Sequence, residues 1–203
     1  MKDYKLQLDA FSFPESKGLT EKYFNSYWLN RDELNDVWSN IKCDIYTKDS
    51  SKLSEFKFNP GFEIIPFKGG LLLTEEELEI LKSCMKMTND TSFVIIEDYD
   101  ENSPPHKSGP PLRFKYPADI TWQEIMGGGY ISIELFQMSH KNYFVFGDSG
   151  EWGKYVANDY KFPLDIIGFR NKYAELFKRN FVLSIEERNE IYEWLPETYK
   201  RYI

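Results

Sequence analysis

Two clusters of carboxylates are the residues whose types and spacing best suit recognition of another molecule. The chain places Glu75, Glu76 and Glu79 in the first cluster, and in the second it places Glu97, Asp98, Asp100 and Glu101. Residues 63–101 contain ten acids and three bases, so they carry a net charge of −7 out of −8 for the whole chain. A dense negative surface attracts cationic partners and steers their approach. If the two clusters meet in space, they form an acidic face.

Ordinary solvation is the alternative interpretation of these acids. Glutamates at the amino end of a helix are favoured by the helix dipole, and most charged runs serve solubility. Glu77, which lies inside the first cluster, is expected to cap a helix that begins after Thr74. The acidic face therefore depends on how the helix and the strand pack.

A glycine-rich segment carries Gly-Asp-Ser-Gly at 147–150, which resembles the nucleophile segment of trypsin-like serine proteases. The resemblance covers four residues. Those proteases continue with glycine, whereas Glu151 would place a carboxylate beside the developing oxyanion. Neither His106 nor His140 lies in the sequence context of their catalytic base. We therefore expect a turn in which the aspartate and serine bond to backbone amides.

Trp152 follows this turn and is a candidate partner-binding residue. An indole on a surface turn is a frequent anchor of protein interfaces. A ring folded back over the edge of the sheet is the alternative.

No pattern of metal ligands or of phosphate-binding glycines is found. The two cysteines and two histidines are too widely spaced for structural zinc, and the acidic run at 98–102 lacks the later glycine and glutamate of a calcium loop. The glycine pairs and triplets are not followed by the lysine of a phosphate loop. We predict neither a metal nor a cofactor.

Length and composition bound the class of protein. A chain of 203 residues with 41% hydrophobic residues favours one globular domain over residues 1–203 with a substantial core. The excess of 33 acids over 25 bases disfavours nucleic acid, and no apolar stretch is long enough for a membrane helix. Because the first residues do not form a leader and only two cysteines occur, we expect a cytoplasmic protein.

Helices are predicted from capping boxes and from apolar residues at helical spacing. Thr74 and Ser184 each begin a box with a glutamate three residues later. Apolar residues follow the first box at helical spacing and predict one buried stripe: Leu78, Leu81, Cys84 and Met85. Further helices are expected over 170–181 and 21–40.

Strands are predicted over 93–96, 143–146, 154–158 and 164–169, with 131–136 expected to form a hairpin with 143–146. Strands and helices do not alternate regularly. The prediction is an α+β fold, a mainly antiparallel sheet with helices packed on one side in a single pair of layers.

These observations favour a noncatalytic intracellular interaction protein of bacterial type, whose acidic face binds a basic protein partner. Toxin-neutralising immunity proteins have this character as a class. The alternative is an enzyme acting on a small molecule or glycan, with a pocket lined by carboxylates and aromatic rings. A carbohydrate-binding module with exposed coplanar rings is a third hypothesis. A deep pocket holding a carboxylate with a perturbed pKa would favour the enzyme.

Overall fold

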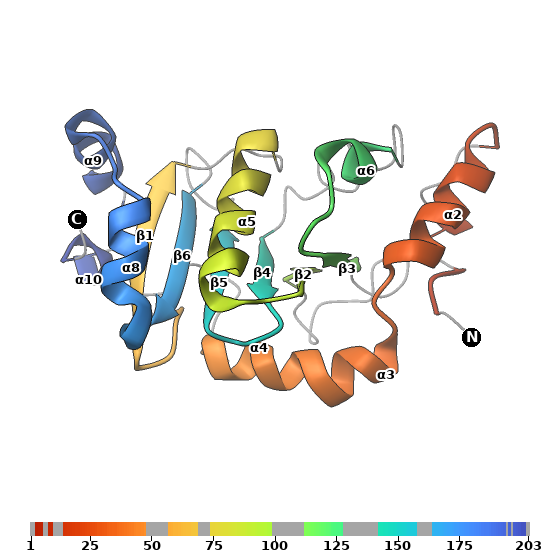
Figure 1. Ribbon diagram of the computed structural model, residues 1–203, viewed down its shortest axis with the longest axis horizontal. Helices are drawn as coiled ribbons and strands as arrows, with labels where there is room; N and C mark the ends of the chain where they lie inside the picture. The colour runs from red at the N-terminus through yellow and green to blue at the C-terminus, as the bar shows by residue number, and fades with distance from the viewer. Residues whose placement is uncertain are drawn as a thin grey trace.

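The computed structural model describes residues 3–5, 8–9, 14–47, 57–68, 74–98, 112–127, 142–157, 164–193, 195 and 197–201. Six strands form one sheet, and every neighbouring pair is antiparallel (Figure 1). The strands are β1 (Phe62–Lys68), β2 (Ser92–Glu97), β3 (Arg113–Pro117), β4 (Tyr143–Gly147), β5 (Trp152–Ala157) and β6 (Leu164–Arg170). Their order across the sheet is β1-β6-β5-β4-β2-β3. The predicted α+β class with an antiparallel sheet is confirmed.

Helices lie against both faces of the sheet, which corrects the expectation that they pack on one side. The first face carries α2 (Lys17–Tyr27), α5 (Glu75–Thr88), α6 (Trp122–Met126) and α8 (Ala174–Asn180). Against the second face pack η1 (Leu34–Trp38), α4 (Ser39–Ile45) and α9 (Ile185–Tyr192). Three short helical segments complete the described fold: α3 (Arg31–Glu33), η2 (Asn171–Tyr173) and α10 (Glu197–Lys200).

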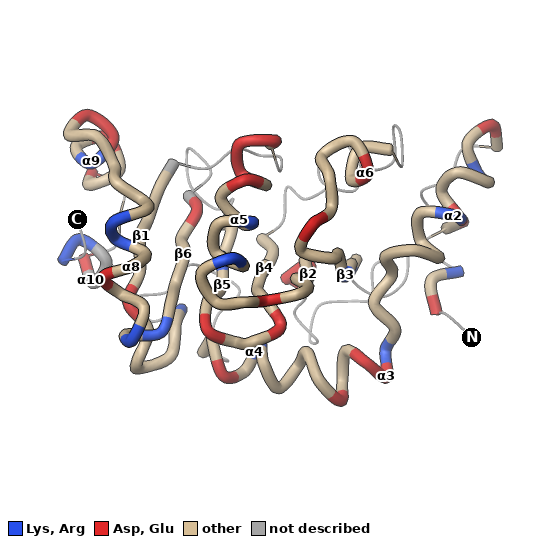
Figure 2. Tube along the Cα trace, in the orientation of Figure 1, with Lys and Arg blue, Asp and Glu red and all other residues tan. Residues whose placement is uncertain are grey.

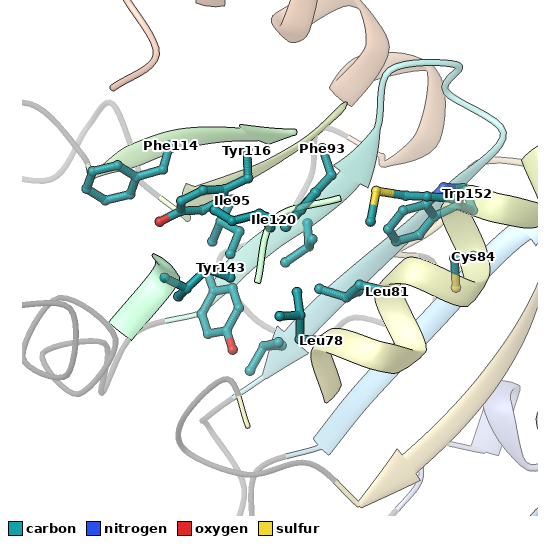
Figure 3. Close-up of a cluster of buried hydrophobic side chains, with 14 of the residues drawn as sticks. Leu78, Leu81, Cys84, Phe93, Ile95, Phe114, Tyr116, Ile120, Tyr143 and Trp152 are labelled. Carbon is teal, nitrogen blue, oxygen red and sulfur yellow. The ribbon is translucent and has the colours of Figure 1, made fainter. Parts of the chain in front are cut away.

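The first core lies between α5 and the sheet. Leu78, Leu81 and Cys84 are fully buried on the inner face of α5 and belong to one cluster with strand side chains such as Ile95 and Trp152 (Figure 3). The stripe that α5 buries is the one predicted from helical spacing. Burying each large apolar side chain contributes about 1.5 to 3 kcal/mol, so this stripe holds α5 firmly on the sheet.

The second core lies on the opposite face. Trp38 and Tyr46 pack against Phe144 and Phe146, with ring centroids 4.6 Å apart for Tyr46 and Phe144. The Tyr46 hydroxyl donates to the carbonyls of Val145 and Lys154, at 3.1 Å each. Strands covered on both faces are apolar at successive positions. A strand covered on one face only would alternate apolar and polar residues. The unbroken apolar run at 93–96 therefore agrees with helices on both faces of the sheet.

Most predicted elements are present with shifted boundaries. The helix expected over 21–40 is interrupted at Trp28, which is extended and forms a bridge with Phe114 of β3. Asn89 ends α5 in the left-handed conformation (φ 58°), which turns the chain directly into β2. Strand β1 was not predicted, and it contains Pro66, which the ladder tolerates because β1 is an edge strand.

The segment predicted as a hairpin strand, 131–136, lies outside the described residues, and the strand partners of β4 are β2 and β5. Within the described part of the chain, no helix is both long and apolar enough to cross a membrane.

Candidate functional site

The capping box at the start of α5 decides which glutamates face outward. The Glu77 amide donates to Thr74 Oγ1, and the Thr74 amide donates to Glu77 Oε2, both at 3.1 Å. This reciprocal cap fixes the first turn and directs Glu77 toward the sheet, where it is buried. Glu75, Glu76 and Glu79 remain exposed. Figure 2 shows acidic residues gathered at the upper end of α5.

A groove of about 590 Å³ runs between α5 and the segment that joins α8 to α9. Ile65, Phe67 and Ile167 of β1 and β6 form part of its lining, and Phe181 and Val182 contribute from the far side. The charged side chains that line it are all acidic: Glu76, Glu77, Glu79 and Glu187. Among the described residues, no lysine or arginine lines this acidic groove. Its lining therefore combines apolar surface with carboxylates.

Glu187 brings a carboxylate to the side of the acidic groove opposite α5. It belongs to the predicted capping box of α9, in which its amide donates to Ser184 Oγ at 3.1 Å and its Oε2 accepts from the Ser184 amide at 2.8 Å. These hydrogen bonds lower the pKa of Glu187. The carboxylate is therefore ionised at neutral pH.

Under the start of α5, three ionisable side chains form a buried cluster, which we call the lysine cluster. Lys154 Nζ of β5 lies 2.6 Å from Asp165 Oδ2 of β6 and 3.1 Å from Glu77 Oε1. Lys154 and Asp165 are almost fully buried, while Glu77 is also part of the wall of the acidic groove. The lysine cluster is thus connected to the groove through Glu77.

Burial and charge set the protonation of the lysine cluster. Burial raises the pKa of Asp165 to about 8, with Lys154 opposing this shift and Glu77 reinforcing it. Burial acts against the charged form of Lys154, but Asp165, Tyr143 and Glu77 outweigh it and raise the pKa of the ammonium. Burial likewise opposes ionisation of Glu77, but Lys154 and its hydrogen bonds keep its pKa below the ordinary value. At neutral pH, Lys154 and Glu77 are charged and Asp165 holds a proton.

The second predicted acidic cluster does not line the acidic groove in the described part of the chain. Glu97 Oε2 accepts from the Leu112 amide at 3.1 Å. Asp98 Oδ2 lies 3.6 Å from Lys57 Nζ and accepts from the Tyr155 hydroxyl at 3.2 Å. Asp100 and Glu101 lie outside the described residues. Both described members thus contribute to internal hydrogen bonds or ion pairs.

Trp152 is buried, so it offers no surface to a partner, and its interpretation as an exposed anchor needs correction. Its Nε1 donates to Asp90 Oδ2 at 2.8 Å, which draws the ring over the sheet. The Ser149 amide donates to Asp90 Oδ1, and Asp148 Oδ2 accepts from the amides of Thr91 and Ser92 at 3.1 and 3.0 Å. The segment at 147–150, which we call the glycine turn, is therefore a turn that bonds to backbone amides.

Potential metal ligands do not gather in the described residues, where no group of three or more histidine, cysteine or acidic side chains could hold an ion. His106 and His140 lie outside those residues. Cys43 is exposed and Cys84 is buried, and neither forms a disulfide. Burial raises the pKa of the Cys84 thiol, which makes it a poor nucleophile.

Comparison with protein-family models, curated proteins and solved structures gives no match for this chain. The site must therefore be interpreted from its own geometry.

Sequence reasoning missed Lys154, Asp165 and Glu187 as members of this site. One signal was present: Asp165 interrupts an otherwise apolar strand, with Ile166 and Ile167 following it. A carboxylate in a buried strand needs a cationic partner, and Lys154 on the neighbouring strand supplies it. The register between β5 and β6 that joins them is not readable from the sequence.

Proposed function

We propose that this protein is a noncatalytic interaction protein that binds a basic protein partner through the acidic groove. The observation that carries the proposal is the lining: four carboxylates surround apolar side chains, with no lysine or arginine among the described lining residues. A partner that offers arginine or lysine beside apolar side chains complements both properties.

Exposed apolar side chains beside the acidic groove extend this surface. Val182 and Ile185 are 73% and 77% exposed, and Val182 also lines the groove. Apolar side chains surrounded by acids suit a partner in which burial supplies affinity while charge sets orientation and association rate. Neutralisation of a basic toxin inside a bacterial cell is one function of this kind, and the cytoplasmic location belongs to the same proposal.

The test compares two changes on the same helical turn. Replacing Glu76 and Glu79 by lysine puts positive charge in the groove, whereas Glu75→Lys changes an exposed neighbour that does not line it. The probe is an acetylated, amidated peptide of alternating arginine and leucine, with citrulline in place of arginine as the neutral control. We expect the double variant to lose at least about tenfold in affinity, because it reverses two charges that line the groove, and Glu75→Lys to lose much less, because Glu75 is exposed and does not line it.

Equal affinity for the arginine and citrulline peptides would overturn the proposal, as would a double variant that binds like the wild type. Binding is measured by fluorescence anisotropy. A basic protein captured from native lysate by the wild type, and lost with the double variant but retained with Glu75→Lys, would then identify the partner.

An enzyme acting on a small molecule or glycan is the second candidate, because a specific observation favours it. The volume of about 590 Å³ lies within the range of small-ligand sites, and Asp165, whose pKa is raised to about 8, lies next to Glu77 of the groove wall. Only Phe67 and Phe181 supply rings to the described lining. Turnover of a small substrate, abolished by Glu77→Gln while the peptide still binds, would favour the enzyme.

A further inference from the structure

The lysine cluster contains one more carboxyl group than it has cations. Lys154 Nζ lies within ion-pair distance of both Asp165 and Glu77, and it is the sole described cation in ion-pair contact with either carboxyl. Two buried carboxylates that share one ammonium leave a net negative charge in a region from which water is largely excluded. Such charge is removed most cheaply by protonating one carboxyl.

Hydrogen bonding favours Asp165 as the carboxyl that takes the proton. Glu77 accepts from the Thr74 amide at 3.1 Å and is paired with Lys154. Asp165 is fully buried, and within the described residues no donor reaches its Oδ1. A proton on Asp165 lets this carboxyl donate to Glu77 instead of remaining unsatisfied, and burial together with Glu77 shifts its pKa in that direction.

The position of Glu77 connects this proton to the acidic groove. Glu77 is the member of the lysine cluster that forms part of the groove wall. A cationic group placed beside Glu77 from the groove would supply the missing positive charge. Asp165 would then gain little from holding its proton, because Lys154 is free to pair with it alone.

We infer, resting on the proposed function of the acidic groove, that one arginine or lysine side chain of the basic partner inserts beside Glu77 and that Asp165 releases one proton when it does. The O–H bond of the Asp165 carboxyl breaks, the proton passes to solvent, and the carboxylate pairs with Lys154. Glu77 then pairs with the cation of the partner. Charge is conserved, since one positive group enters and one proton leaves.

The other groups that face Asp165 do not replace it as the source of the proton. Lys154 on β5 and Tyr143 on β4 both have raised pKa values and stay protonated, while Glu77 on α5 has a lowered pKa and has already lost its proton. Across the sheet, β1 places Phe67 opposite Asp165, and a phenyl ring does not titrate.

Calorimetry in two buffers of different ionisation enthalpy, phosphate and Tris, measures the proton directly. With the arginine and leucine peptide at about pH 7, we expect release of about one proton per peptide by the wild type and of none by Asp165→Asn. Glu79→Gln is the matched control, because it removes one negative charge from the groove and leaves the lysine cluster unchanged. We expect this variant to bind the peptide more weakly and still to release the proton from Asp165.

The wild type alone provides a second readout that needs no variant to fold. The release of a proton on peptide binding should disappear above about pH 9.5, because Asp165 is then already ionised before the peptide binds. Peptide binding without proton release at about pH 7 overturns this inference and leaves the acidic groove as a binding site. Failure of the peptide to bind overturns the proposed function itself.

Discussion

The two ends of α5 each bury carboxyl groups, but they satisfy them in different ways. At the carboxyl end, Asp90 accepts from Thr88, Ser149 and Trp152, and Asp148 accepts from Thr91 and Ser92. At the amino end, Glu77 and Asp165 share a single Lys154, and Asp165 Oδ1 has no described donor.

This difference separates a structural role from a functional one. Several donors bond to Asp90 and Asp148, which also hydrogen-bond to each other, and Asp90 holds Trp152 in place, so these two acids fix the β4–β5 connection. The lysine cluster lacks one positive charge and reaches a groove through Glu77. A buried polar group with unmet bonding capacity beside an opening is a candidate for binding, whereas a saturated group is a candidate for stability.

Removing the ammonium of the lysine cluster should have the largest effect. Lys154→Met leaves Glu77 without its cation in a buried site, and we expect a loss of about 3 to 5 kcal/mol in the free energy of unfolding. Urea denaturation measures it. Lys172→Met, at an exposed lysine paired with Glu151, is the control and should unfold like the wild type. If Lys154→Met lost as little free energy of unfolding as Lys172→Met, the lysine cluster would be hydrated, and its charges would not be buried away from water.

The stability of the wild type should fall as pH rises from about 5 to about 7. The pKa of Asp165 is raised to about 8 in the fold, against about 3.9 in the unfolded chain, so the folded state binds one more proton across this window. Stability from this group is therefore greatest at low pH and is lost as pH approaches 8, with a slope of at most about 1.4 kcal/mol per pH unit.

Asp165→Asn is the control for this pH dependence, because it removes the titrating group and keeps its shape. The difference between the two proteins in urea unfolding at each pH isolates Asp165 from every other titratable group. Parallel curves for the two proteins would show that Asp165 is ionised throughout and that the comparison between the two ends of α5 is wrong.

A smaller loss is expected at the other end of the helix. Asp90→Ala removes the acceptor of the Trp152 indole and of the Ser149 amide, and leaving these donors unsatisfied should cost about 2 kcal/mol. Affinity for the arginine peptide should not change, since Asp90 does not line the acidic groove. A variant that folds normally but binds the peptide weakly would assign a binding role to the glycine turn.

Much of the local structure could be predicted from the sequence because its causes are local. The capping boxes at Thr74 and Ser184 are present as expected, and so is the stripe that α5 buries. Trp152 was ambiguous because its exposure depends on Asp90, a distant residue whose carboxylate draws the indole inward.

The candidate site could be predicted only in part because it depends on contacts between distant segments. Glu76 and Glu79 were found from their clustering, but Glu187 reaches the acidic groove from more than a hundred positions away. Lys154 and Asp165 meet through strand register. Helices on both faces of the sheet also follow from long-range packing, although the unbroken apolar run of β2 was a signal for it.

Methyl NMR of the labelled protein during titration with the arginine and leucine peptide tests the central claim most directly. We expect the methyl signals of Ile65, Ile80 and Ile167, which line the acidic groove, to shift with a common affinity. Signals of Val94 and Ile166 in the second core should stay in place. Shifts confined to the second core, or an unchanged spectrum at saturating peptide, would contradict the claim that this groove binds a basic partner.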